Sequence, residues 1–271
     1  MYLQKFEVKN KTALVTGAGK GIGKASAIAL AEAGADLIIL SRTISDLNAV
    51  KREIIKLKRK CKIFECDVSN YEELYKIFNQ ISKLDILVNN AGTNRPENFS
   101  KVKTKDMNYV VDLNIKAAFN VAQLATKVML KTKKRKALGG SIINMSSQLG
   151  KVGAPNRSVY NMTKFGIEGL TKGMAIDLAK NNIRVNSISP GAIATPIFYG
   201  GSARANTLSD EENQKKMDKL KNNLAKAVPL KRTGLAEDIA EGALYLASDA
   251  GQFVNCHDLV IDAGRTSMFY E

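Results

Sequence analysis

The stretch TALVTGAGKGIG, residues 12–23, decides the fold of this chain. It begins with a short apolar run of the kind found in strands that are covered on both faces of a sheet. Four glycines follow, at positions 17, 19, 21 and 23. Glycines allow a tight turn and let the backbone approach a pyrophosphate bound at a helix N-terminus. The turn comes directly after the first strand, and this position favours a nucleotide-binding turn over a tight turn that binds no ligand.

The spacing of the glycines excludes two common phosphate-binding motifs. From Gly17 to Gly23 the pattern is G-x-x-x-G-x-G, which differs from the G-x-G-x-x-G of many dehydrogenases. A P-loop is excluded because Lys24 is followed by Ala25, where that motif has serine or threonine.

Strand patterns alternate with helical patterns along the whole chain. The predicted strands are 12–15, 36–40, 62–66, 86–89, 141–145, 184–189 and 259–261, and helical patterns include 21–33, 44–59, 72–81, 158–181 and 236–246. Such alternation produces right-handed crossovers and a parallel sheet. We therefore predict an α/β fold of one Rossmann-type domain, residues 1–271. Its doubly wound sheet should have about seven strands, with helices on both faces.

Residues 195–229 interrupt this regular alternation. The segment is long, polar and rich in lysine, and it lies between a strand and the last helix. Long connections of this kind are usually functional lids or disordered segments. We predict that it is a substrate-binding lid within the domain.

Composition argues against membrane, zinc and disulfide chemistry. No run of about 18 apolar residues is present and the first ten residues are charged, so neither a transmembrane helix nor a signal peptide is expected. Cys61, Cys66 and Cys256 are scattered and odd in number, which fits a reducing cytoplasm. His257 is the only histidine, which excludes chemistry built on several histidines. No metal site is expected.

The net charge of +15 has two interpretations. It could attract nucleic acid or an acidic substrate, or it could be a lysine-rich background on helix surfaces. The basic residues are dispersed over 51–62, 131–136 and 215–226, and aromatic residues do not alternate with them. The second interpretation is favoured, and no nucleic-acid partner is expected.

Several further motifs follow the glycine turn in a fixed order. They are Asn89-Asn90-Ala91-Gly92 after the fourth strand, Asn114 within a helix, Ser147, Tyr160-x-x-x-Lys164, and Pro190-Gly191 followed by Thr195. With them, residues 11 to about 266 resemble the short-chain dehydrogenase/reductase family. The resemblance implies a nicotinamide-dependent oxidoreductase with a small-molecule substrate. It also implies a homotetramer, in which 236–246 and 259–261 would form one interface and 158–181 would help form another.

The end of the second predicted strand indicates the cofactor. A NAD-binding Rossmann fold usually has an acidic residue there, which binds the ribose 2′-hydroxyl, whereas this chain has Ser41 and Arg42. The guanidinium of Arg42 suits a 2′-phosphate, and Lys20 can reach the same group. NADP(H) is therefore predicted rather than NAD(H). The resemblance implies that the other cofactor-binding residues are Gly17, Gly19, Gly21, Ile22 and Gly23 in the turn, Asp67 and Val68 at the adenine, Asn90 near the adenosine ribose, and Ile193 and Thr195 at the nicotinamide carboxamide.

Tyr160 and Lys164 are the predicted catalytic pair. They are four residues apart on a predicted helix and so share a face. A free tyrosine has a pKa near ~10, and a neighbouring ammonium favours the phenolate and lowers that pKa. Tyr160 would then act as the general acid in ketone reduction and as the general base in alcohol oxidation. Lys164 would also bind the nicotinamide ribose.

The resemblance implies two more catalytic residues. Ser147, 13 residues before Tyr160, would hold the substrate carbonyl oxygen beside the tyrosine, and this spacing favours it over Ser146. Asn114 would hold a water that links Lys164 to the solvent. The alternative interpretation of Asn114 is a helix kink or cap.

The sequence leaves the substrate open. The family includes reductases of acyl-carrier-protein ketoacyl groups as well as enzymes of sugars, sugar acids, secondary alcohols and steroids. The 37 residues between Pro190-Gly191 and Pro229-Leu230 are more than such acyl reductases usually have, and a larger lid suits a small enclosed substrate. A small carbonyl or sugar-type substrate is therefore ranked first and a 3-oxoacyl-[acyl-carrier-protein] reductase second. A non-catalytic cofactor-binding protein is the alternative from another class, and the complete catalytic set argues against it.

Overall fold

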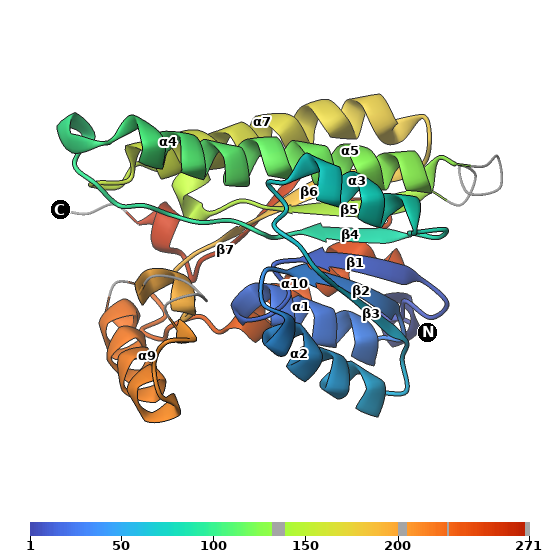
Figure 1. The fold of residues 1–271 in the computed structure, drawn as a ribbon, viewed down its shortest axis with the longest axis horizontal. Coiled ribbons are helices and arrows are strands. Elements are labelled where there is room, and N and C mark those ends of the chain that lie inside the picture. Colours follow the sequence, from blue (N-terminus) through green and yellow to red (C-terminus); the bar gives the residue numbers. More distant parts are fainter. Residues whose placement is uncertain (132–138, 200–204, 227, 269–271) are drawn as a thin grey trace.

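A parallel sheet forms the centre of the molecule (Figure 1). The computed structural model describes residues 1–131, 139–199, 205–226 and 228–268. Within them seven strands are hydrogen-bonded in the order β3-β2-β1-β4-β5-β6-β7, and all neighbouring pairs are parallel. The strands are β1 (Thr12–Thr16), β2 (Asp36–Ser41), β3 (Cys61–Glu65), β4 (Ile86–Asn89), β5 (Gly140–Met145), β6 (Ile183–Pro190) and β7 (Asp258–Ile261). Each predicted strand is confirmed to within one residue at either end.

The strand order reverses between β1 and β4. From β1 the chain builds outward through β2 to β3, and it then crosses back to place β4 on the other side of β1. In open parallel sheets such a reversal leaves a crevice at the carboxyl ends of the two central strands, where ligands bind. The glycine turn follows β1 at this point, and the Asn89–Gly92 motif follows β4.

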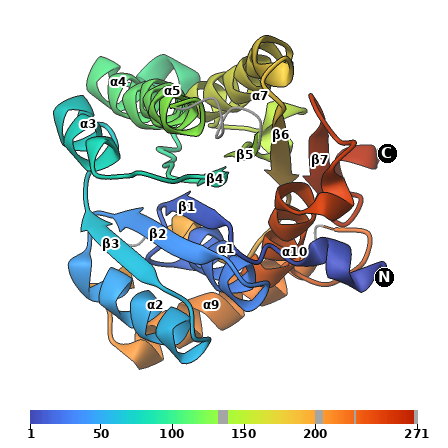
Figure 2. The same ribbon diagram turned by 90° about the vertical axis from the view of Figure 1, so that its right-hand side faces the viewer.

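Helices cover both faces of the sheet, as predicted (Figure 2). One face carries α1 (Gly21–Glu32), α2 (Ile44–Lys56) and α10 (Ala236–Ala247), and the other carries α3 (Tyr71–Asn79), α4 (Thr104–Val111), α5 (Ala117–Met129) and α7 (Ser158–Ala179). Successive residues of β1 point to opposite faces. Val15 packs in the core beneath α1 and α10, whereas Leu14 packs in the core beneath α3 and α5.

The segment 195–229 contains a helix that the sequence patterns did not indicate. The 3₁₀ turn η5 (Pro196–Tyr199) is followed by α9 (Asp210–Ala225), which has no buried residue. A capping box starts the helix, since Glu212 N donates to Ser209 Oγ at 3.2 Å and Ser209 N donates to Glu212 Oε2 at 2.9 Å. With no buried apolar face, α9 lacks the periodic pattern by which the other helices were recognised.

None of the described helices is both long and apolar enough to cross a membrane.

Candidate active site

The glycine turn has the backbone shape that only glycine adopts easily. Gly17 and Gly21 have φ angles of +64° and +55°, in the left-handed region. A Cβ at Gly23 would lie 2.3 Å from the carbonyl oxygen of Gly17, so the turn and the first turn of α1 can pack together only without a side chain there. Ile22 packs against the hydrophobic core and fixes the start of α1.

The N-terminus of α1 is suited to an anion. Lys20 occupies the N-cap position but its side chain makes no capping hydrogen bond to the helix. The first backbone N–H groups of a helix have no partner within the helix and carry partial positive charge. The glycine turn therefore fits the pyrophosphate of a dinucleotide on the evidence of its own geometry.

Asn90 ties the glycine turn to the end of β4. Its Nδ2 donates to the carbonyl oxygen of Thr16 at 3.0 Å, and its backbone N donates to Thr16 Oγ1 at 2.9 Å. Asn90 thus makes hydrogen bonds that join the ends of β1 and β4. The contact of Asn90 with the adenosine ribose stays a prediction.

The residues predicted at the adenosine end lie together at the carboxyl ends of β1, β2 and β3. A Cβ at Gly19 would lie 3.1 Å from Ser41 Oγ, which places the turn directly beside Ser41. Arg42 is half exposed, and its Nη1 donates to the hydroxyl of Tyr109 at 3.2 Å. The same nitrogen is 4.0 Å from a carboxylate oxygen of Asp67. Val68 is buried next to them.

Two residues of this region were not among the predicted ones. Asp46, in the first turn of α2, pairs with Lys20 at 3.1 Å. Tyr109, on α4, lies between two cations, because Arg95 stacks over its ring at 4.8 Å while Arg42 bonds its hydroxyl. The acidic residue that binds the ribose 2′-hydroxyl in NAD-binding folds is expected at the end of the second strand, whereas Asp46 comes five residues beyond Ser41. No local pattern marks Tyr109, since its partners come from other segments.

Thr195 lies beside the glycine turn, and Ile193 lies two residues before it in the turn after β6. Both are buried, and the nearest side-chain atom to a Cβ placed at Gly21 is Thr195 Cγ2, at 3.3 Å. Ile193 forms an isolated parallel bridge with Gly234, which holds the turn after β6 in place.

Ser147 and Tyr160 meet at the carboxyl end of β5. Hydrogen bonding from Ser147 is one of the influences on the pKa of Tyr160, and Ser147 Oγ accepts from the backbone N of Leu149 at 3.1 Å. Burial of the phenol raises the pKa of Tyr160 to about 12, although the bond to Ser147 and the charge of Arg157 act in the opposite direction.

Lys164 is buried one turn beyond Tyr160 on α7. Its Nζ donates to the carbonyl oxygen of Met145 at 2.8 Å and lies 5.5 Å from the centre of the Tyr160 ring. Desolvation lowers the pKa of Lys164 to about 8. The expected lowering of the Tyr160 pKa by Lys164 is wrong for this structure, because burial dominates that pKa and the ammonium is directed to Met145.

Asn114 lies in a π-helical turn, η3 (Asp112–Lys116), between α4 and α5. Its Oδ1 accepts from Thr93 N at 2.8 Å, and its Nδ2 donates to Thr93 O at 2.9 Å and to Thr163 Oγ1 at 3.1 Å. The side chain thus fixes the segment after β4 to the residue that precedes Lys164. The position of Asn114 in a helix irregularity agrees with the kink interpretation, whereas its predicted role of holding a water beside Lys164 stays a prediction.

A buried ionic cluster supports the loop that carries Ser147. Lys151 Nζ lies 2.5 Å from Glu168 Oε2 and 3.0 Å from Asp258 Oδ2. Burial lowers the pKa of Lys151, but hydrogen bonds to the two carboxylates outweigh this effect and the net pKa is raised. Ser146 Oγ donates to Glu168 Oε1 at 3.2 Å, so Ser146 belongs to this cluster. Its engagement there agrees with the choice of Ser147 as the catalytic serine.

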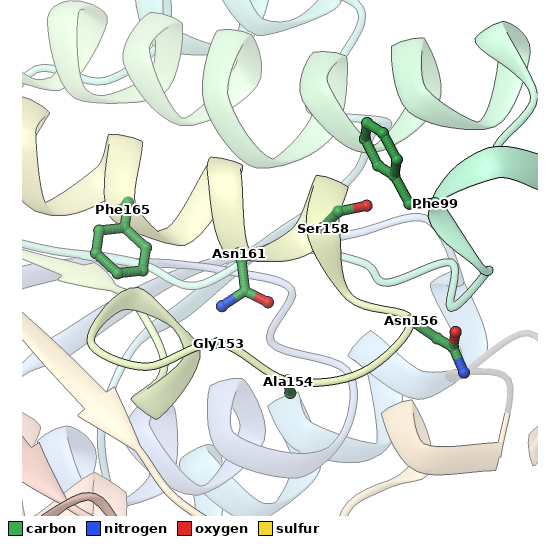
Figure 3. A pocket seen from close by; sticks show the side chains of 7 residues that line it. All are labelled: Phe99, Gly153, Ala154, Asn156, Ser158, Asn161 and Phe165. Carbon is green, nitrogen blue, oxygen red and sulfur yellow. The ribbon is translucent and has the colours of Figure 1, made fainter.

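A groove of about 480 Å³ lies beside α7 (Figure 3). Figure 3 shows that α7 and the loop before it form most of its wall. Its lining residues are Phe99, Gly153, Ala154, Asn156, Ser158, Asn161 and Phe165. The groove includes none of the four predicted catalytic residues. The candidate active site is therefore placed where the side chains of Ser147, Tyr160 and Lys164 come together. Among the described residues, no three His, Cys, Asp or Glu side chains are grouped as metal ligands would be.

Known proteins are similar to this chain in sequence and in fold. The family model described as enoyl-(acyl carrier protein) reductase matches residues 17–266. An uncharacterized oxidoreductase of Mycobacterium tuberculosis is 35% identical over 98% of this chain and 96% of its own length. The 3-oxoacyl-[acyl-carrier-protein] reductase FabG of Thermotoga maritima is 32% identical over 95% of this chain and 98% of its own. The crystal structure of a gluconate 5-dehydrogenase of Burkholderia cenocepacia, in complex with NADP and tartrate, has a TM-score of 0.85 and 30% identity, covering 99% of this chain and all of that one.

Proposed function

Because this chain belongs to the short-chain dehydrogenase/reductase family, whose members are oxidoreductases acting on CH–OH groups, we propose that it interconverts a ketone and a secondary alcohol with NADP(H). The substrate is a small carbonyl or sugar-type compound. The chain is an enzyme rather than a non-catalytic binding protein, since the relatives that it matches along its whole length are oxidoreductases.

The observation that carries the proposal is the meeting of Ser147, Tyr160 and Lys164. The hydroxyl of Ser147 acts on the Tyr160 phenol and lowers its pKa, and the buried ammonium of Lys164 lies 5.5 Å from the centre of the same ring. Side chains of a loop and of a long helix converge here at the carboxyl end of the sheet, beside the proposed dinucleotide site. A proton donor and a carbonyl-binding hydroxyl are what ketone reduction requires of the protein.

In the direction of reduction, Tyr160 donates its phenolic proton to the substrate carbonyl oxygen while the carbonyl carbon becomes a CH–OH carbon. Ser147 holds that oxygen by a hydrogen bond. For Lys164 to stabilise the phenolate that remains, its ammonium has to turn from the carbonyl oxygen of Met145, to which it is bound in the structure, towards the tyrosine hydroxyl. When bound, the nicotinamide cofactor supplies the hydride, and it accepts one in the reverse direction. Asn114 is a positioning residue, which holds Thr163 and thereby the helical turn that carries Lys164.

NADP(H) is proposed as the preferred cofactor. Arg42 and Lys20 supply two cations beside Ser41, and the gluconate 5-dehydrogenase of similar fold was solved with NADP. A guanidinium and an ammonium are the groups that bind a phosphate most strongly. The rest of the proposed cofactor site consists of Gly17, Gly19, Gly21, Ile22, Gly23, Asp67, Val68, Asn90, Ile193 and Thr195.

A small substrate is proposed on the basis of the segment 195–229. Its residue Asn206 bonds Asp46 at 3.1 Å, and Thr195 lies at Gly21, so the described parts of the segment border the cofactor site. A lid in this place can enclose a compact substrate and exclude water. The second candidate, a 3-oxoacyl-[acyl-carrier-protein] reductase, is favoured by the similarity to FabG.

The proposal is tested by following the absorbance of NADPH with a panel of ketones. The panel contains keto-sugar acids, small aliphatic ketones, a bulky steroid ketone and a ketoacyl thioester. We expect the keto-sugar acids or small ketones to give the highest kcat/KM. Turnover of the thioester alone would establish the second candidate, and turnover of none with either cofactor would reject the proposed reaction class.

We also propose a homotetramer that acts in a reducing cytoplasm. Exposed apolar side chains lie on α5 and α7, among them Phe119, Phe165 and Ile176, the last of which is 71% exposed. Phe253, before β7, is fully exposed. These two places correspond to the two proposed interfaces. All three cysteines are free, which fits a reducing compartment.

A further inference from the structure

The adenosine end of the proposed cofactor site contains a carboxylate that does not belong to the expected binding residues. Asp46 Oδ1 lies 3.1 Å from Lys20 Nζ, and the Asp46 side chain is only 12% exposed. Lys20 is one of the two cations on which the proposed preference for NADP depends. In this structure its charge is already balanced by Asp46.

Asp46 is held in place from two further directions. Its second oxygen, Oδ2, accepts a hydrogen bond from Asn206 Nδ2 at 3.1 Å, and Asn206 comes from the segment 195–229. A Cβ at Gly19 would lie 2.9 Å from Asp46 Cβ and 3.1 Å from Ser41 Oγ. Asp46 therefore lies against the glycine turn and beside Ser41, within the group of residues proposed to bind the 2′-phosphate.

We propose that Asp46 limits the selectivity for NADP over NAD by competing with the 2′-phosphate for Lys20. This inference rests on the proposed function, in which Lys20 and Arg42 bind that phosphate. A ligand with a 2′-phosphate must draw Lys20 away from Asp46 or accept a like charge as a close neighbour, and either costs binding free energy. A ligand without the phosphate has no need of Lys20 and is little affected. Asp46 thus brings the affinities for the two cofactors closer together.

The experiment compares two fragments of the cofactors, 2′,5′-ADP and 5′-AMP, by isothermal titration calorimetry on the full chain. These probes differ only in the phosphate and do not depend on turnover. Asp46→Asn removes the charge and keeps the size of the side chain. We expect it to raise the affinity for 2′,5′-ADP on the order of 10-fold, equivalent to about 1.4 kcal/mol. The affinity for 5′-AMP should change less than about 2-fold, and the gain for 2′,5′-ADP should shrink at high salt.

Glu53→Gln is the matched control. Glu53 lies on the same helix as Asp46 and pairs with a lysine of α1, Lys24, at 2.8 Å, but both side chains are about 40% exposed. This variant removes one negative charge from α2 and should leave the ratio of the two affinities unchanged. If Asp46→Asn also leaves the ratio unchanged, the inference is wrong. A loss of 5′-AMP affinity in Asp46→Asn would also overturn it, because Asp46 would then bind the ribose hydroxyl directly.

The wild-type protein and Arg42→Asp separate this inference from the proposed cofactor preference. Wild type that binds 5′-AMP as tightly as 2′,5′-ADP would refute the preference, while a gain in Asp46→Asn would still support competition for Lys20. Arg42→Asp should lose affinity for 2′,5′-ADP alone. Binding of neither probe to a folded wild type would overturn both statements.

Discussion

The Nζ of Lys164 lies 5.5 Å from the centre of the Tyr160 ring and donates to the carbonyl oxygen of Met145, 2.8 Å away. The ammonium is thus close to the phenol but is bound to the backbone of β5. Burial raises the pKa of Tyr160 to about 12 and lowers the pKa of Lys164 to about 8. Both shifts disfavour the charged forms, as desolvation does. The protonation of the Tyr160 phenol and of the Lys164 amine therefore depends strongly on how much water or ligand surrounds them in the site.

Tyr160→Phe should lower kcat by ~10²-fold or more, since a general acid–base group contributes about that factor. The ring is retained, so the affinity for NADPH should change little. The measurements are steady-state kinetics and calorimetric binding of NADPH. Tyr71→Phe, on the exposed side of α3, is the matched control and should keep full activity. Unchanged kcat in Tyr160→Phe would remove Tyr160 from the acid–base role.

Lys164→Met should abolish activity and yet stabilise the fold at pH 7. The drop in pKa from 10.5 to about 8 corresponds to about 3 kcal/mol of destabilisation at neutral pH. Loss of the hydrogen bond to Met145 offsets about 1 kcal/mol of the gain. Urea unfolding at pH 7 should therefore give a higher free energy of unfolding for the variant.

The pH dependence of this effect has a definite sign. Between pH 8 and 10.5 the unfolded chain keeps a proton on Lys164 that the folded chain has released, so wild-type stability from this group rises with pH. The advantage of Lys164→Met should shrink over that range and be gone above it. Lys172→Met, at an exposed position of the same helix, should show no such trend. A variant that is less stable than wild type at pH 7 would contradict the desolvation argument.

Lys151→Met should destabilise the protein, because it leaves Glu168 and Asp258 buried without their cation. Breaking a buried ion pair costs about 3–5 kcal/mol, and since Lys151 is one-third exposed we expect about 1–3 kcal/mol. Urea unfolding measures the loss, and Lys151→Arg should restore most of it. The cost of Lys151→Met should be smaller in a Glu168→Gln background, since one of the two charges is already absent. If Lys151→Met lowers the free energy of unfolding equally in wild type and in Glu168→Gln, Lys151 and Glu168 are not coupled.

Light scattering at micromolar concentration should give four times the mass of one chain. Ile176→Glu places a charge on the exposed apolar face of α7 and should reduce that mass. Ile55→Glu is the matched control, because Ile55 is a half-exposed isoleucine on α2, away from the proposed interfaces. A wild-type mass of one chain would reject the tetramer, and an equal effect of both variants would reject α7 as the interface.

The strands were predictable because several of them, such as β1 and β2, are nearly continuous apolar runs. Leu14 and Val15 are both fully buried, on opposite faces of the sheet. Both positions are therefore apolar, and the apolar run in the sequence is not interrupted there. Helix α9 was missed because it buries nothing. The pair Ser209 and Glu212 was nevertheless a readable capping box, and it gives the start of the helix correctly.

Tyr160 and Lys164 could be proposed as a catalytic pair from the sequence because their spacing is local. The ionic cluster could not be proposed in this way, since Asp258 follows Lys151 by more than a hundred residues and only the fold brings them together. For the same reason no motif connects Arg42 with Tyr109. The expected effect of Lys164 on Tyr160 failed because spacing on a helix gives a shared face but not the direction of the ammonium.

The π-helical turn at Asp112–Lys116 has a consequence for insertions and deletions. A π turn holds one residue more than an α turn, so α5 is out of phase with α4 by roughly 100° compared with an unbroken helix. Loss of a single residue here would allow a continuous helix to form and would rotate Asn114 away from Thr93 and Thr163. The chain could then keep its sheet and its helix layers and still lose the brace beneath Lys164. We therefore expect a one-residue deletion in this turn to lower activity more than it lowers the stability of the fold.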